Sequence, residues 1–176
     1  MASSGKLRDG GGMFGRNQRA RVAGACRLAV ATVGLLWGPA AWAQKPLGID
    51  VSLWQGTITP ANWTQVYNSG RRFAFIKASQ GTTVTDPRFY SNVANAPVAG
   101  LLVAPYHFAD PLNERQPADG HTAVDEANYF VAVAGNYMTA GYLPPVLDLE
   151  YGSSMGKTAL SNWANSFCNR VLALKG

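Results

Sequence analysis

The stretch Pro144-Pro145-Val146-Leu147-Asp148-Leu149-Glu150-Tyr151-Gly152 contains a short apolar run that ends in two acids. Two prolines precede the run and turn-forming residues follow it, which predicts a buried strand opening into a loop. Alternate side chains of a strand share a face, so Asp148 and Glu150 should point the same way, about 6.6 Å apart along the backbone. Barrel and doubly wound α/β folds place their chemistry at such strand ends.

Further apolar segments predict three more strands, with helical patterns between the four. The predicted strands are 47–52, 72–79, 101–108 and 145–150, and the predicted helices are 60–69, 87–96, 118–135 and 157–174. Strands that alternate with helices indicate a parallel sheet with right-handed crossovers. A closed eight-stranded barrel needs at least about 200 residues. We therefore expect an α/β fold, a partial TIM-like (β/α) barrel of roughly the first four βα units, truncated at its carboxyl end.

The amino-terminal quarter has the pattern of a secretory signal peptide, residues 1–43. Six basic side chains and one acidic side chain precede or flank an uncharged stretch, Leu28 to Trp37, and the small-residue site Ala41-Trp42-Ala43 follows. A spanning helix needs about 20 apolar residues, and Gly38-Pro39 ends this run early, so we expect no stable membrane anchor after cleavage. An uncleaved anchor is the alternative. We expect an exported protein, periplasmic or extracellular, with residues 44–176 as its incomplete catalytic domain.

The basic character of the chain belongs to the predicted signal. Residues 1–43 carry the whole formal charge of +5, whereas residues 44–176 hold nine basic and nine acidic side chains. A basic stripe with interleaved aromatics is missing, so the sequence predicts no nucleic-acid partner. Metal-ligand spacing and a glycine-rich phosphate loop are also missing, so we expect neither metal nor cofactor. Cys168, the one cysteine after the signal, should be buried or should pair outside this chain.

Two carboxyl groups as close as Asp148 and Glu150 resist joint ionisation, so one pKa should be raised while the other stays low. One proton donor and one anion form the pair that cleaves a glycosidic bond. The alternative is a solvated or ion-paired strand end. The spacing leaves the stereochemistry open, because side-chain rotamers span the separations of both retaining and inverting enzymes.

Five sequence blocks follow one another in a specific order and spacing from Leu47 onward. They are Gly48-Ile49-Asp50-Val51-Ser52-Leu53-Trp54-Gln55-Gly56, Phe73 to Ser79, Thr85 to Phe89, Ala104 to Phe108 and Pro145 to Glu150. Together they resemble glycoside hydrolase family 25, the Chalaropsis-type lysozymes. The resemblance covers essentially all of the chain after the predicted signal.

The resemblance implies hydrolysis of the β-1,4 bond between N-acetylmuramic acid and N-acetylglucosamine in peptidoglycan, and it favours retention. Carried over by position, Glu150 would be the general acid that protonates the leaving oxygen. Asp148 would stabilise the positive charge that develops at the sugar, by orienting the substrate's acetamido group. Asp50 would add a third carboxylate, and Tyr106 would sit beside the reacting sugar.

Three more residues are candidates for substrate binding: Trp54, Gln55 and Lys77. Trp54 could stack on a sugar, since aromatic faces offer large apolar contact. Lys77 could pair with a carboxylate of the site or form an ordinary ion pair. His107 lies among apolar neighbours, which indicates a structural histidine with its hydrogen bonds satisfied, whereas His121 lies in a polar loop with no evident partner.

Two departures from the family pattern bear on activity. Gln80 stands where the family usually has Glu, and the family's later strands, with a further Asp of the site, have no counterpart. Two rival interpretations follow: a non-catalytic peptidoglycan- or glycan-binding protein that keeps the floor of the cleft, and an inactive fragment of such an enzyme.

Overall fold

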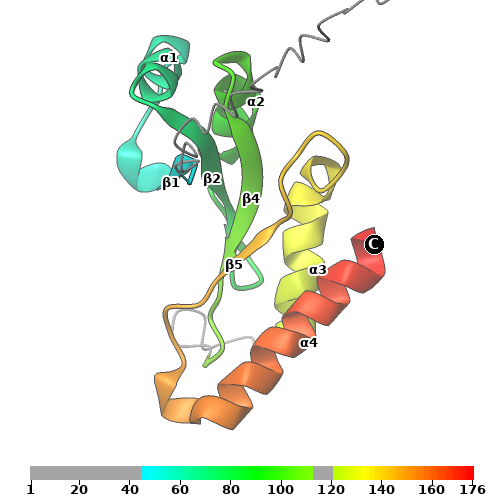
Figure 1. Ribbon diagram of the computed structural model, residues 1–176. Coiled ribbons are helices and arrows are strands. Elements are labelled where there is room, and N and C mark those ends of the chain that lie inside the picture. The colour runs from blue at the N-terminus through cyan, green and yellow to red at the C-terminus, as the bar shows by residue number, and fades with distance from the viewer. Residues whose placement is uncertain (1–44, 113–120) are drawn as a thin grey trace, which may run out of the picture. The chain divides into compact units, whose positions relative to one another are not determined.

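The computed structural model describes residues 45–112 and 121–176. Its centre is a sheet in the strand order β1-β2-β4-β5, and all three of the neighbouring pairs are parallel (Figure 1). The strands are β1 (Leu47–Val51), β2 (Arg71–Gln80), β4 (Leu102–Phe108) and β5 (Val146–Asp148), and the two-residue strand β3 (Val84–Thr85) pairs antiparallel with β2. The predicted α/β class and partial barrel of parallel strands are confirmed.

Four α-helices connect or follow these strands. They are α1 (Pro60–Asn68), α2 (Phe89–Val98), α3 (Ala123–Ala134) and α4 (Lys157–Lys175), with short 3-10 helices at Leu53–Gln55, Gly135–Tyr137 and Ser153–Met155. Among the described residues, the predicted third helix 118–135 is wrong at 121 and 122, which precede α3, because Thr122 caps the helix by accepting a hydrogen bond from the Asp125 N–H. Residues 118–120 and the predicted signal peptide 1–43 lie outside the described residues.

The core lies between the sheet and the helices. Trp63 of α1, Phe89 of α2 and Phe130 of α3 are fully buried in it, together with Ile76 of β2. Full burial of an aromatic or aliphatic side chain stabilises a fold by about 1.5–3 kcal/mol relative to exposure, so these few residues dominate the packing. Trp63 lies at an inward position of the predicted helix 60–69, which predicts core packing, and its full burial confirms this.

The apolar side of helix α4 is only partly buried. Trp163, Phe167, Val171 and Leu174 share one side of the predicted helix 157–174, which predicts an inward face. Phe167 and Val171 are buried and Trp163 packs at the edge of the core, as this pattern predicts, but Leu174 is 40% exposed. Cys168 is exposed and free, so the expectation of a buried cysteine is wrong, while the alternative of a partner outside this chain stays a prediction. One residue beyond Phe167, it is rotated about 100° away from the buried face. Within residues 45–112 and 121–176, no helix has the length and apolar character needed to cross a bilayer.

Strand β2 contains a bulge that directs side chains of the site. Lys77 pairs with Tyr106 and Ser79 pairs with His107, so Ala78 is one extra residue on β2. A bulge of this kind re-aims the side chains on either side of it. Ser79 thereby reaches His107, while Lys77 and Gln80 come close enough to hydrogen-bond at 2.9 Å.

Candidate active site

One cavity contains all seven of the site residues predicted from the sequence. We call it the acidic cavity, and it is lined by Asp50, Trp54, Gln55, Lys77, Tyr106, Asp148 and Glu150, with Ser52, Gln80, Asp86 and Phe108 among its other residues. The carboxyl ends of β2, β4 and β5 point toward the bottom of Figure 1. Parallel strands in an unbroken order bring their carboxyl ends to one edge of the sheet, which is why distant sequence blocks meet here.

The sheet register sets the height of each side chain. Asp50 pairs with Phe75, Lys77 with Tyr106, and Phe108 with Asp148. Side chains alternate between the two faces of a strand, so Tyr106 and Phe108 face the cavity while His107 faces the helices. The result is a layer of polar side chains at the carboxyl edge of the sheet.

Asp148 and Glu150 both line the acidic cavity, although the strand prediction extended too far. Strand β5 ends at Asp148, and Glu150 lies in the following segment, where it is exposed. Asp148 is half-buried, and its pKa is raised above the ordinary value of 3.8, first by burial and then by the charges of Glu150 and Asp50, while Lys77 opposes the rise. The fold thus raises the pKa of the residue to which the sequence analysis gave the anionic role.

Tyr106 lies beside these acids and is itself buried. Burial raises the pKa of its phenol, and the charges of Asp148, Asp50 and Asp86 raise it further, while a hydrogen bond with Ser52 acts in the opposite direction. A phenol with a raised pKa stays protonated at neutral pH, so Tyr106 can donate a hydrogen bond to a group in the cavity.

Lys77 is the one cation among the described residues that line the acidic cavity. It is only 7% exposed, and its Nζ donates to Gln80 Oε1 at 2.9 Å and lies 4.4 Å from the centre of the Phe108 ring. A buried ammonium needs such partners because its transfer out of water is costly. The positive charge counteracts the raised pKa of Asp148.

The 3-10 helix Leu53–Gln55 carries two of the predicted binding residues. Trp54 is 82% exposed at the cavity, whereas the Gln55 side-chain oxygen accepts the Ser52 N–H at 2.7 Å and closes a capping box. Asp86 is buried and holds the same segment, since its carboxylate accepts the N–H groups of Leu53 and Arg88, both at 2.8 Å. Trp54 is therefore presented to solvent on a fixed backbone.

Comparison with known proteins identifies the family. The family model described as Glycosyl hydrolases family 25 matches residues 49–176. This chain belongs to glycosyl hydrolases family 25. The resemblance inferred from the sequence blocks is thereby confirmed.

Two curated proteins and one solved structure are similar to this chain over most of its length. Lysozyme M1 of Streptomyces globisporus is 38% identical over 133 residues, which cover 72% of this chain and 42% of that protein. The N,O-diacetylmuramidase of a Chalaropsis species is 32% identical over 139 residues, 73% of this chain and 61% of that protein. The structure of a muramidase from Trichobolus zukalii, 38% identical, aligns with a TM-score of 0.61 over 73% of this chain and 60% of its own. The chain thus spans between 42% and 61% of the length of these family 25 proteins.

Two residues of this site were not predicted from the sequence. Ser52 hydrogen-bonds the Tyr106 phenol and the buried Asp86 anchors the 3-10 helix, yet neither residue was predicted to belong to the site. The Asp86-Pro87 pair at a helix start could have suggested a capping carboxylate. Within residues 45–112 and 121–176, no group of three or more His, Cys, Asp or Glu side chains is arranged to hold a metal ion.

Proposed function

We propose that this chain carries the acid machinery of a muramidase, which hydrolyses the β-1,4 bond between N-acetylmuramic acid and N-acetylglucosamine in peptidoglycan. The observation that carries the proposal is the convergence of Asp50, Asp148 and Glu150, with Tyr106, on one cavity at the carboxyl edge of a family 25 fold. A carboxyl group whose pKa is raised by burial and by neighbouring acids, as that of Asp148 is, is typical of a catalytic site when it lies in a cleft.

The exposed Glu150 is proposed as the general acid. It gives its proton to the oxygen that leaves with N-acetylglucosamine, while the bond from that oxygen to C1 of N-acetylmuramic acid breaks. Asp148 orients the acetamido group of the same sugar and stabilises the positive charge that develops at C1. A water molecule then adds its oxygen to C1, and its proton restores Glu150. Only carboxyl groups, the substrate's own acetamido group and water take part, so the proposed mechanism uses no cofactor.

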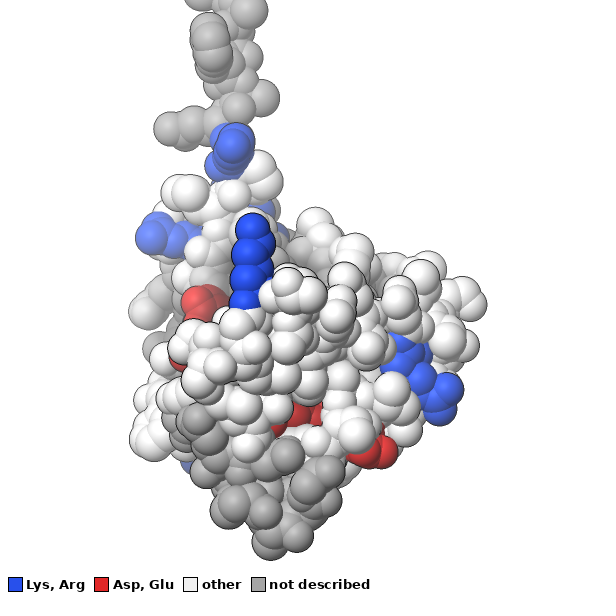
Figure 2. All heavy atoms as spheres, turned by 90° about the horizontal axis from the view of Figure 1, so that it is seen from below, with Lys and Arg blue, Asp and Glu red and all other residues white. Residues whose placement is uncertain are grey.

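Binding is proposed to rest on the residues around these acids. Trp54, exposed on its fixed 3-10 helix, offers a face on which a sugar ring can stack, and the Tyr106 phenol can donate a hydrogen bond. The end of the molecule toward which the strands run shows scattered charges among mostly uncharged residues (Figure 2). Such a surface suits a polar glycan strand better than a polyanion. Gln55 and Lys77 would complete the site.

Peptidoglycan as substrate requires the protein to leave the cytoplasm, and the predicted signal in residues 1–43 would supply that route. We infer a periplasmic or extracellular place of action for residues 44–176. N-terminal sequencing of the exported protein would test the inference. An amino terminus at Gln44 supports it, and a protein retained in the cytoplasm with Met1 or Met13 intact contradicts it.

The decisive experiment compares the wild-type chain with Glu150→Gln on purified cell walls. Wild type should release reducing ends that borohydride converts to muramitol, because cleavage at C1 of N-acetylmuramic acid leaves that sugar at the end. Glu150→Gln should lower the rate by about 100- to 10,000-fold. Asp125→Asn is the matched control, since that exposed carboxylate caps α3 and does not line the acidic cavity.

Each of the other results points to a different conclusion. Glucosaminitol in place of muramitol would show cleavage at C1 of N-acetylglucosamine and would contradict the proposed bond specificity. Equal rates for wild type and Glu150→Gln would refute the acid assignment. Sedimentation of both proteins with insoluble peptidoglycan, without release of sugar from either, would favour the rival interpretation as a glycan-binding protein.

A further inference from the structure

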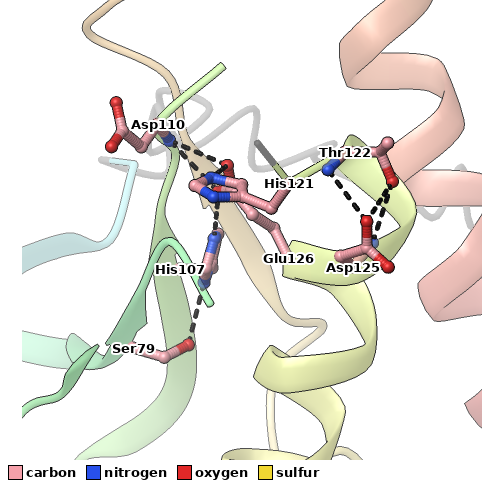
Figure 3. A network of polar contacts seen from close by, with 7 residues as sticks. All are labelled: Ser79, His107, Asp110, His121, Thr122, Asp125 and Glu126. Atoms are coloured by element: carbon pink, nitrogen blue, oxygen red, sulfur yellow. Dashed lines mark hydrogen bonds and ion pairs between the residues drawn. The ribbon is translucent and has the colours of Figure 1, made fainter. Parts of the chain in front are cut away.

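Behind the acidic cavity, a fully buried carboxylate on α3 is bound by two histidines. Glu126 Oε2 lies 2.7 Å from His107 Nε2, and Glu126 Oε1 lies 2.8 Å from His121 Nε2 (Figure 3). The backbone N–H of Asp110 donates to the same carboxylate, at 3.1 and 3.3 Å from its two oxygens. The expectation that His107 is a satisfied structural histidine is confirmed. The statement that His121 has no partner is wrong.

The protons of this cluster can be placed from its hydrogen bonds. Burial lowers the pKa of His107, which favours the neutral ring, although Glu126 partly opposes this effect. An ionised carboxylate only accepts, so the His107 proton lies on Nε2, and Nδ1 accepts the Ser79 hydroxyl at 2.8 Å. The Glu126 side chain is thus held by groups from β4, from the segment after it and from the residue before the N-cap of α3.

The cluster is connected to the acidic cavity through two consecutive backbone amides. The N–H of Asp110 binds Glu126, and the N–H of Ala109 donates to the carbonyl oxygen of Asp148 at 2.9 Å. Phe108, the residue before them, pairs with Asp148 in the sheet and places its ring against the Lys77 ammonium. A displacement of the Ala109–Asp110 segment would therefore move the backbone of Asp148 directly.

An apolar cluster of the same volume would hold α3 against β4 at least as firmly, because a buried carboxylate brings a large desolvation cost. Directional hydrogen bonds supply something that apolar contacts do not, namely a fixed position for one backbone amide. We propose that Glu126, with His107 and His121, is a positioning group that fixes the Ala109–Asp110 segment and through it Asp148. The consequence for catalysis rests on the proposed function, whereas the positional link does not.

Amide hydrogen exchange of the full chain tests the positional link without any measurement of activity. Glu126→Gln keeps the side-chain shape, but it puts an N–H₂ group where a carboxylate oxygen now accepts hydrogen bonds. The protection of the Ala109 and Asp110 amides should fall by about tenfold or more relative to the amides of the β2–β4 ladder. Asp125→Asn removes the same charge from the neighbouring, exposed position of α3 and should leave this ratio unchanged.

A second variant keeps the test decisive if Glu126→Gln fails to fold. His121→Ala removes the donor at the edge of the cluster and should lower the same two protection factors by a smaller amount. Unchanged protection of Ala109 relative to the ladder, in whichever of these variants folds, would overturn the proposal. So would an equal loss of protection in Asp125→Asn.

Kinetics on soluble glycan fragments then separate positioning from mere structural support. Glu126→Gln should lower kcat by about tenfold or more while KM changes less than about twofold, because the cluster does not touch the substrate. A rise in KM alone would contradict positioning of Asp148. If wild type releases no sugar, the proposed function fails, and hydrogen exchange still decides the positional link.

Discussion

Gly48 of β1 lies directly beneath the ring of Phe73, so Gly48→Ala should destabilise the fold for a steric reason. A Cβ at this position would lie 2.1, 2.3 and 2.4 Å from the ring carbons Cε2, Cδ2 and Cζ of Phe73. Carbon atoms pack at about 3.5–4.0 Å, so the ring must retreat by more than an ångström. The Phe75 ring, with its centre 5.1 Å away, restricts that movement. Overpacking of this kind costs about 1–3 kcal/mol of unfolding free energy.

Urea unfolding of four proteins tests this reasoning: wild type, Gly48→Ala, Phe73→Ala and the double variant. Without the ring, alanine at 48 meets no obstacle and should stabilise by about 0.4–1 kcal/mol, because it reduces the freedom of the unfolded chain. The double-mutant cycle should thus give a coupling energy of at least about 1 kcal/mol. An equal cost of Gly48→Ala in both backgrounds would refute the steric account and assign the cost to the backbone of residue 48.

Three further predictions follow from the charges and exposures of the site. Because Asp148 must be ionised to act and its pKa is raised, kcat/KM should fall in acid at a pH above 3.8. Lys77→Met should move this acid fall of kcat/KM to higher pH, because the cation lowers the pKa of Asp148. A shift to lower pH would contradict that role of the cation. Burial lowers the pKa of His107, so below about pH 6.5 the unfolded state binds the proton more readily and urea stability should decline as the pH falls. Replacement of His107 by Gln should flatten that decline, and an unaltered slope would exclude His107 as its source. Trp54 is 82% exposed, so Trp54→Ala should change the unfolding free energy by less than about 0.5 kcal/mol yet weaken sedimentation with peptidoglycan by about tenfold, and undiminished binding would exclude a stacking role.

The meeting of the site residues could be predicted because it follows from strand order alone. Asp50, Tyr106 and Asp148 each come at or near the carboxyl end of an apolar run, and parallel strands bring those ends to one edge. The face of the sheet on which each side chain lies was harder to predict from the sequence. Nothing in the sequence Lys77-Ala78-Ser79 marks the bulge that sends Lys77 into the cavity and Ser79 to the opposite face.

The buried cluster was missed because its partners are separated in the sequence and lie on different elements. His107 is on β4 and Glu126 on α3, and the register of a helix on a sheet depends on the complete packing of both. One signal was nevertheless present. Glu126 falls three residues after Ala123 and four before Phe130, on the apolar stripe that predicted the buried face of α3. A buried acid requires donors, and the chain has only two histidines to offer.

Strand β4 links the stability of the fold to the chemistry of the site through its alternation. Tyr106 and Phe108 face the acidic cavity, while His107 binds Glu126 on the opposite face. A slip of one residue would bury a phenol among helices and expose the histidine to the cavity, so both faces require the same register. Two contacts fix that register: the bulge at Ala78 on β2, and the hydrogen bond from the Asp110 N–H to Glu126 after the end of β4. Substitutions on the helix-facing side of β4 do not touch a glycan. They should therefore change the turnover rate more than they change the affinity for the glycan.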